Sequence, residues 1–166
     1  MINKNYWTTA HANKSMRRRW TEGSKKAGAG LTVDGDQVCT IALTGVWNGL
    51  EKVGEKQYKL RPIVAEWVEP GTTHEIAFDS DYHHKPECLI AIREFGKALQ
   101  KAGGKVYVNV WDTQFKGMDD FIAANGGEEW KKLSAEAIPF EEWQKIVKQL
   151  EKQFNKNQQL ESKKSQ

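Results

Sequence analysis

Apolar residues follow two different patterns along this chain, and the two patterns alternate. Short apolar runs with β-branched residues, at 37–46, 74–81 and 105–112, predict buried strands. In residues 85–104, apolar side chains recur every three or four positions before a Gly-Gly pair, which predicts an amphipathic helix and its end. Strands and helices that alternate in this way are typical of an α/β domain, with parallel strands joined by right-handed crossovers.

Other helices are expected at 60–71, around 119–124 and from residue 140 onward. The two ends of the chain carry few periodic apolar positions. We therefore predict a poorly ordered arm over residues 1–15, one domain over 16–154 and a polar tail over 155–166.

Composition narrows the possible functions only slightly. The 25 basic and 22 acidic residues leave a net charge of +3, which is too small to identify a nucleic-acid-binding protein by itself. Because no apolar run approaches the ~18 residues of a membrane span, we expect a cytoplasmic protein without a membrane partner. Cys39 and Cys88 each lie in an apolar element, which favours reduced, buried thiols over a disulfide or a zinc site.

Several polar residues follow directly after predicted strands. Thr44 and Gly45 follow one strand, Asp79 and Asp81 another, and Asp112 a third. Parallel strands end at one edge of their sheet, where such folds bind ligands. Two carboxylates separated by one residue of extended chain point the same way and suit Mg²⁺. The alternative is that Asp79 caps the next element and Asp81 is merely solvated.

The order of these motifs resembles a known family. The segments TEGSKKA, ALTGVWNG, IAFDSD, VNVWD and KGMDDFIAANG occur in sequence between residues 21 and 126. Together they resemble the Toprim domain of primases, topoisomerases and small nucleases. They are more similar still to an uncharacterised Toprim-like family of bacterial plasmids and phages, often joined to primase or helicase modules. The resemblance implies a three-layer α/β fold with a mostly parallel sheet of about four strands.

The resemblance also implies roles for particular residues. Glu22 matches the glutamate that acts as general acid or base, or as a metal ligand, in phosphoryl transfer. Asp79 and Asp81 match the paired aspartates that hold Mg²⁺ or Mn²⁺, and Asp119 matches a third metal-binding carboxylate. Asp112 and Asp120 are secondary candidates.

Basic residues near these carboxylates are candidates for phosphate contact. Lys116 precedes Asp119, and Lys25 and Lys26 follow Glu22. The alternative for such charged runs is a solvated surface. His83 and His84 are further candidates as ligands or phosphate contacts, with exposed loop histidines as the alternative.

Two residue groups remain open at this stage. Trp111 beside Asp112 is either core or a stacking surface for a base. Residues 17–19 are three consecutive arginines where the first strand is expected, and they cannot all be buried unpaired. Either this strand begins near Trp20, or it lies at an exposed edge, or the amino terminus is rearranged.

The resulting functional hypothesis is a Mg²⁺-binding, Toprim-like domain that acts on nucleic acid, DNA or RNA, in mobile-element replication. A replicative helicase or primase module would then be a partner. Two alternatives stay open: a small metal-dependent nuclease, and a non-catalytic interaction module that retains the fold.

Overall fold

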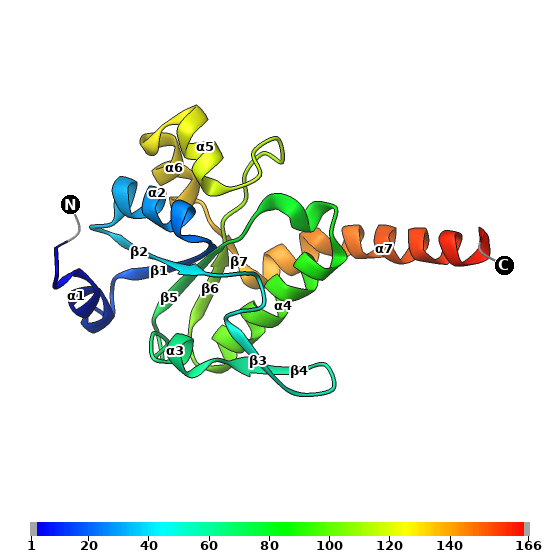
Figure 1. Cartoon of the computed structure of the whole chain (residues 1–166), viewed down its shortest axis with the longest axis horizontal. Helices are drawn as coiled ribbons and strands as arrows, with labels where there is room; N and C mark the ends of the chain where they lie inside the picture. The colour runs from blue at the N-terminus through cyan, green and yellow to red at the C-terminus, as the bar shows by residue number, and fades with distance from the viewer. Residues whose placement is uncertain (1–2, 165–166) are drawn as a thin grey trace.

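A computed structural model describes residues 3–164, and its centre is a sheet of five strands in the order β2-β1-β5-β6-β7 (Figure 1). Strands β2, β1, β5 and β6 pair in parallel with one another in this order, and β7 pairs antiparallel with β6 at the edge of the sheet. The strands of this sheet are β1 (Arg17–Glu22), β2 (Val38–Leu43), β5 (Thr73–Ala77), β6 (Lys105–Val108) and β7 (Ile138–Pro139). The predicted α/β class is confirmed, and the antiparallel β7 brings the sheet to five strands.

Helices cover both faces of the sheet. Helices α2, α5 and α6 pack together on one face, and α4 packs with α7 on the other (Figure 1). These helices are α2 (Ser24–Asp34), α4 (Pro86–Lys101), α5 (Met118–Asn125), α6 (Gly127–Ala135) and α7 (Phe140–Lys164). The elements predicted around 119–124 and from 140 correspond to α5 and α7.

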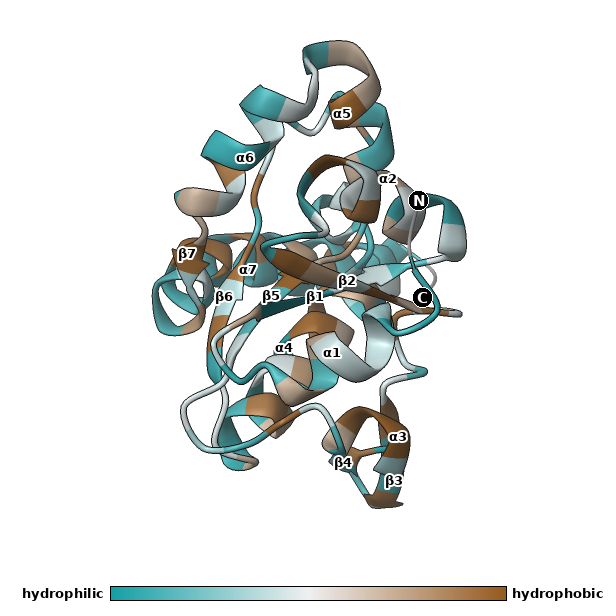
Figure 2. Cartoon of the chain, turned by 90° about the vertical axis from the view of Figure 1, so that its left-hand side faces the viewer, coloured by the Kyte–Doolittle hydropathy of each residue, from teal (hydrophilic) through white to brown (hydrophobic). Residues whose placement is uncertain are grey.

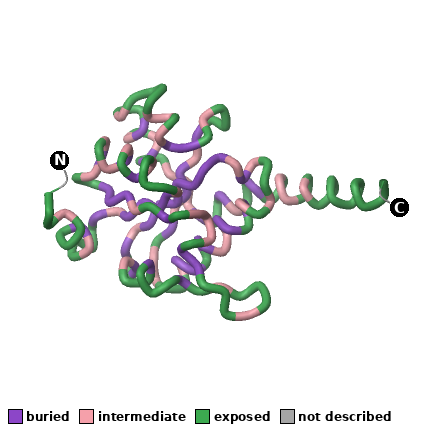
Figure 3. The backbone as a smooth tube through the Cα atoms, viewed as in Figure 1, coloured by how far each residue is buried: buried purple, intermediate pink, exposed green. Residues whose placement is uncertain are grey.

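The ends of the chain differ from the sequence-based expectation. Residues Tyr6–Ala12 form helix α1, which contacts the body through the Tyr6 hydroxyl, a donor to the Gly35 carbonyl oxygen at 2.7 Å, and through the buried Ala10. Its few apolar residues give no long periodic stripe, so the pattern did not reveal it. At the other end, α7 stays helical to Lys164, although its outer half is exposed (Figure 3).

The connection between β2 and β5 is also more elaborate than predicted. It contains a two-stranded hairpin, β3 (Leu50–Gly54) with β4 (Gln57–Leu60), followed by the short helix α3 (Pro62–Ala65). The helix expected over 60–71 therefore lasts a single turn. A one-turn 3-10 helix, η1 (Ser80–His83), follows β5.

The arginine run forms the first half of a central strand. β1 begins at Arg17 and lies between β2 and β5, so the strand neither begins near Trp20 nor lies at an exposed edge. Arg19 is fully buried and binds Asp34 Oδ2 at 2.8 Å and Glu75 Oε2 at 3.0 Å. Arg17 contacts the other oxygen of Glu75 at 2.6 Å, and Arg18 on the opposite face donates to main-chain carbonyls after α1. Two carboxylates therefore neutralise the fully buried charge of Arg19, which could not lie in a central strand without such partners.

The strands of the sheet are rich in hydrophobic residues, brown in Figure 2, and apolar side chains pack in clusters between the sheet and the helices. The larger core, under α4 and α7, includes Trp20, Ile76 and Phe95. A smaller core under α5 and α6 includes Trp111, 8% exposed, and Trp130. Burial of Trp111 removes it as a stacking surface for a base.

Both cysteines are free thiols, Cys39 buried and Cys88 half-buried. Within residues 3–164, no helix combines the length and the apolar character that crossing a membrane requires.

Candidate functional site

Strands β1 and β5 end side by side, and this brings two predicted carboxylates together. The main-chain amide of Asp79 donates to Glu22 Oε1 at 3.2 Å. Gly23 follows Glu22 with φ of 78°, a left-handed conformation that favours glycine, and the chain then turns into α2. The sequence Glu-Gly thus places a carboxylate at the last position of β1 and starts α2 at once.

Asp79 lies deep in this edge. Its residue is 8% exposed, and Lys26 from the first turn of α2 places Nζ 3.2 Å from Asp79 Oδ1. The ammonium group of Lys26 lowers the pKa of Asp79 against the effect of burial, and Oδ1 has no other donor. A metal ion at this oxygen would therefore take the place of the lysine.

Asp119, in the first turn of α5, reaches the same place. Its Oδ1 is buried without a hydrogen-bond donor, and its Oδ2 lies 3.3 Å from Lys25 Nζ. A Cβ placed on Gly117 would lie 2.5 Å from Asp119 Oδ1 and 3.3 Å from Asp79 Oδ1. The same Cβ would lie 2.4 Å from Lys26 Cε, so the two buried carboxylate oxygens and the Lys26 side chain share the space beside Gly117.

Asp81 is arranged differently from the prediction. The chain enters η1 at Ser80, so the two aspartates do not share an extended segment. Asp81 Oδ2 lies 2.7 Å from Lys85 Nζ and 3.8 Å from Lys116 Nζ. The turn is held by the main-chain amide of Ser80, which donates to the Lys116 carbonyl oxygen at 2.8 Å.

The pKa shifts of Glu22, Asp79 and Asp81 differ in direction. Burial, with the charge of Asp79 beside it, raises the pKa of Glu22 above its usual value. Burial also raises the pKa of Asp79, against the opposing effect of Lys26. The hydrogen bond from Lys85 lowers the pKa of the more exposed Asp81. Glu22 and Asp79 therefore hold protons more readily than free carboxyls, and a cation at the edge would oppose this.

The donor set fits a hard divalent cation, which prefers carboxylate oxygens. The buried oxygens of Asp79 and Asp119 are the best placed to hold it, with Glu22 next to Asp79. Among residues 3–164, however, no three acidic, histidine or cysteine side chains are already arranged around a metal position. Lysines stand between the acids, so binding requires Lys26 to move away from Asp79.

The two secondary carboxylates have local structural roles. Asp112 Oδ1 accepts the Gln114 amide at 3.0 Å, which closes a turn. Asp120 Oδ2 accepts the Gly117 amide at 3.2 Å and caps the start of α5. Neither contact connects these residues to Glu22 or Asp79.

Two further residues belong to this edge and were not predicted. Gly117 is required for the close approach of α5, which becomes visible only in three dimensions. Lys85 was not singled out, although its spacing of four residues from Asp81 is a signal that the sequence contains.

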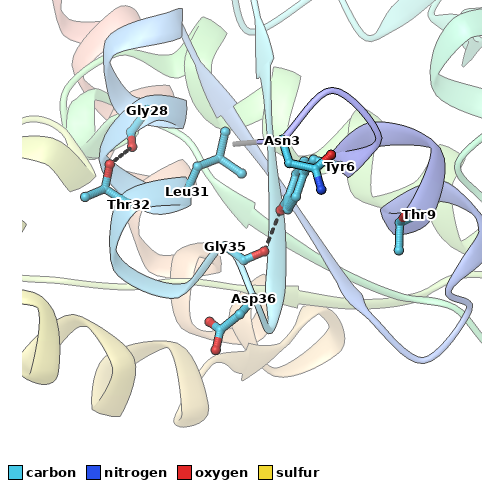
Figure 4. A pocket seen from close by; sticks show the side chains of 8 residues that line it. All are labelled: Asn3, Tyr6, Thr9, Gly28, Leu31, Thr32, Gly35 and Asp36. Atoms are coloured by element: carbon cyan, nitrogen blue, oxygen red, sulfur yellow. Dashed lines mark hydrogen bonds between the residues drawn. The ribbon is translucent and has the colours of Figure 1, made fainter. Parts of the chain in front are cut away.

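A surface cavity of about 610 Å³ lies elsewhere (Figure 4). It opens between α1 and α2 and is lined by Tyr6, Leu31 and Asp36 among others. Asp36 belongs to the turn before β2, so this cavity lies at the end of the sheet where the parallel strands begin. Glu22 lies at the other end, where they finish. It lacks the converging charged groups of the carboxyl edge.

Fold and site together define an α/β domain whose parallel strands end in a cluster of acidic and basic side chains. The chain belongs to the family described as a domain of unknown function (DUF3854), whose profile matches residues 6–129. It is similar to an uncharacterized protein of Picosynechococcus sp., with 35% identity over 132 residues. That region is 74% of this chain and 13% of the relative, so the chain spans a small part of the relative's length.

Proposed function

We propose that this chain is a Toprim-like domain that binds Mg²⁺ or Mn²⁺ and acts on nucleic acid by phosphoryl transfer. The observation that carries the proposal is the pair of buried oxygens without hydrogen bonds, Asp79 Oδ1 and Asp119 Oδ1, beside Gly117. Glu22 next to this pair has a raised pKa, which suits a group that gives and takes a proton.

In this proposal the divalent ion, when bound, neutralises charge on the phosphate. Asp79 and Asp119 hold the ion, and Glu22 accepts the proton of the attacking hydroxyl or water. The lysines that leave the aspartates, Lys26 first, become available to phosphate oxygens. The expected setting is the cytoplasmic replication machinery of a mobile element, with a primase or helicase module as partner.

A second candidate is a non-catalytic interaction module that retains the fold. The ion pairs favour it: Asp79, Asp81 and Asp119 are each already paired with a lysine. A metal-dependent nuclease is the catalytic alternative to primer synthesis, because it needs no further subdomain.

Calorimetric titration with Mn²⁺ tests the proposal. We expect the wild type to bind Mn²⁺ at millimolar concentration or below, and Asp79→Asn to bind at least about tenfold more weakly, because an amide lacks the charge that a hard cation needs. Asp36→Asn, at the opposite edge, is the matched control and should bind like the wild type. Wild-type protein that binds no Mn²⁺ would refute the metal site.

Incubation of the protein with labelled DNA or RNA and Mn²⁺ then distinguishes the candidate functions. Cleavage identifies a nuclease, and nucleotide incorporation identifies a primase-like activity. Metal binding with neither reaction supports the non-catalytic module.

A further inference from the structure

A second surface feature adjoins the acidic edge. A groove of about 400 Å³ runs between η1 and α7, and most of its lining is apolar. Its walls include Tyr82, His83, Val110, Trp143 and Ile146. His83 belongs to the same helical turn as Asp81, so one end of the groove begins where the acidic edge ends.

The chemistry of the groove fits a flat aromatic ring. The accessible apolar surface of the groove comes from Ile146 at the rim, 60% exposed, and from the half-buried Val110 and Ile138. Tyr82 and Trp143 are buried beneath them and support the groove from below. His83 from η1 adds a flat imidazole ring to the wall of the groove. Gln149 and Gln153 line the side on α7, and each amide offers donors and acceptors to the edge of a base.

The charge beside this groove identifies the class of ligand further. Lys145, Lys152 and Lys156 are spaced by seven and four residues on α7, so they share one face next to Gln149 and Gln153. All three are exposed, and within the described residues none of their ammonium groups forms an ion pair. A row of free cations along an apolar groove is complementary to a strand with phosphates on one side and bases on the other.

We propose that the groove between η1 and α7 is a binding site for an unpaired nucleobase of single-stranded nucleic acid. The lysine row holds the adjoining phosphates, and the strand runs from α7 past η1 toward Asp79. This inference rests on the proposed action on nucleic acid, and it names the substrate as single-stranded. Duplex is excluded because its bases are stacked and paired, and cannot enter an apolar groove.

Fluorescence anisotropy with a labelled twelve-nucleotide single strand, in EDTA, tests the site apart from any metal. The comparison probe is the same strand with abasic sites in place of its bases. We expect the wild type to prefer the strand with bases by at least about fivefold. Ile146→Asp should abolish that preference and retain binding to the abasic strand, because it replaces an exposed apolar side chain at the rim of the groove with a charged one.

Ile63→Asp on α3 is the matched control, since Ile63 is 71% exposed and precedes β5 at the other edge of the sheet. It should keep the full preference. The triple variant Lys145→Gln, Lys152→Gln, Lys156→Gln should bind both strands more weakly. It should also reduce the slope of log affinity against log salt concentration by about 2. Circular dichroism confirms that each variant keeps its helices.

Equal affinity for the two strands overturns the proposal and leaves the groove to an apolar segment of a protein partner. A preference that survives Ile146→Asp also overturns it, because the bases would then bind elsewhere. The outcome is separate from that of the Mn²⁺ titration: failure of metal binding with an intact base preference removes the catalytic function and leaves this site standing.

Discussion

The amide nitrogen of Asp79 lies 3.2 Å from Glu22 Oε1, and this hydrogen bond joins the ends of two neighbouring strands. It fixes the carboxylate of β1 beside the carboxylate of β5, although 57 residues separate them in sequence. The same bond supplies a partial positive charge to Glu22, which opposes the effect of burial on its pKa. The predictions below begin from this edge.

Gly117→Ala should impair cation binding without unfolding the protein. The backbone at Gly117, with φ of −114° and ψ of 165°, suits alanine, but the added methyl would lie 2.4 Å from Lys26 Cε and 2.5 Å from Asp119 Oδ1. Both side chains must move, so we expect Mn²⁺ affinity to fall about tenfold or more in a calorimetric titration. Gly28→Ala is the control: its Cβ meets nothing within 4 Å, and it should bind normally. Wild-type affinity in Gly117→Ala would contradict the cation site at this position.

Asp79→Asn and Asp81→Asn should differ in stability when no metal is present. Burial disfavours the charge of Asp79, so its replacement by a neutral amide should leave the melting temperature equal or higher. Asp81 instead gains from its bond to Lys85, so Asp81→Asn should melt slightly lower. Thermal denaturation in EDTA measures both. A lower melting temperature for Asp79→Asn would mean that its pairing with Lys26 outweighs its burial.

Glu75→Gln should be strongly destabilising. Glu75 is 1% exposed and binds both Arg17 and Arg19, so the change leaves buried guanidinium charge without its partner. We expect a loss of about 3–5 kcal/mol in the free energy of unfolding, measured by urea denaturation. Glu69→Gln, which breaks the exposed pair with Lys14, should leave the midpoint nearly unchanged. Similar midpoints for the two variants would contradict the role assigned to the buried cluster.

Acidification should destabilise the fold through His74. Its imidazole accepts a hydrogen bond from Trp20 Nε1 at 3.1 Å, and burial lowers its pKa from 6.5 to about 4. The unfolded chain therefore takes up a proton below pH 6.5 that the folded chain refuses until about pH 4. Stability is complete above pH 6.5 and falls as pH drops toward 4, by about 2 kcal/mol at pH 5.

Urea denaturation at pH 7 and pH 5, on the wild type and on His74→Gln, isolates this effect. Glu22 and Asp79, whose raised pKa values act in the opposite direction, are present in both proteins. The variant should therefore lose less stability on acidification than the wild type. Equal losses in the two proteins would exclude His74 as the source.

Much of the fold was predictable because its central elements carry strong patterns. The strand near 37–46 and the helix at 85–104 correspond to β2 and α4, whose apolar positions face the core. The two-residue β7 and the mostly polar α6 have no such signal. Helix α1 was missed for a similar reason, since much of its packing is by polar or amphipathic side chains, such as the Tyr6 hydroxyl and the His11 ring against Trp67.

The candidate site was predictable only as far as strand ends determine it. Glu22 and Asp79 meet because β1 and β5 are parallel neighbours. The position of Asp81 was wrong in detail, because a 3-10 turn replaces the extended chain there. The burial of Arg19 could not be read from the sequence, because its partner Glu75 is 56 residues away.

This separation governs when the domain can form during its synthesis. Arg19 can pair with Asp34 as soon as α2 has been made, but its second carboxylate partner, Glu75, comes later in synthesis. β1 lies between β2 and β5, so it can pair with β2 first and gains its other neighbour only once β5 has been translated. β6 and β7 follow later still, so completion of the sheet depends on non-local contacts.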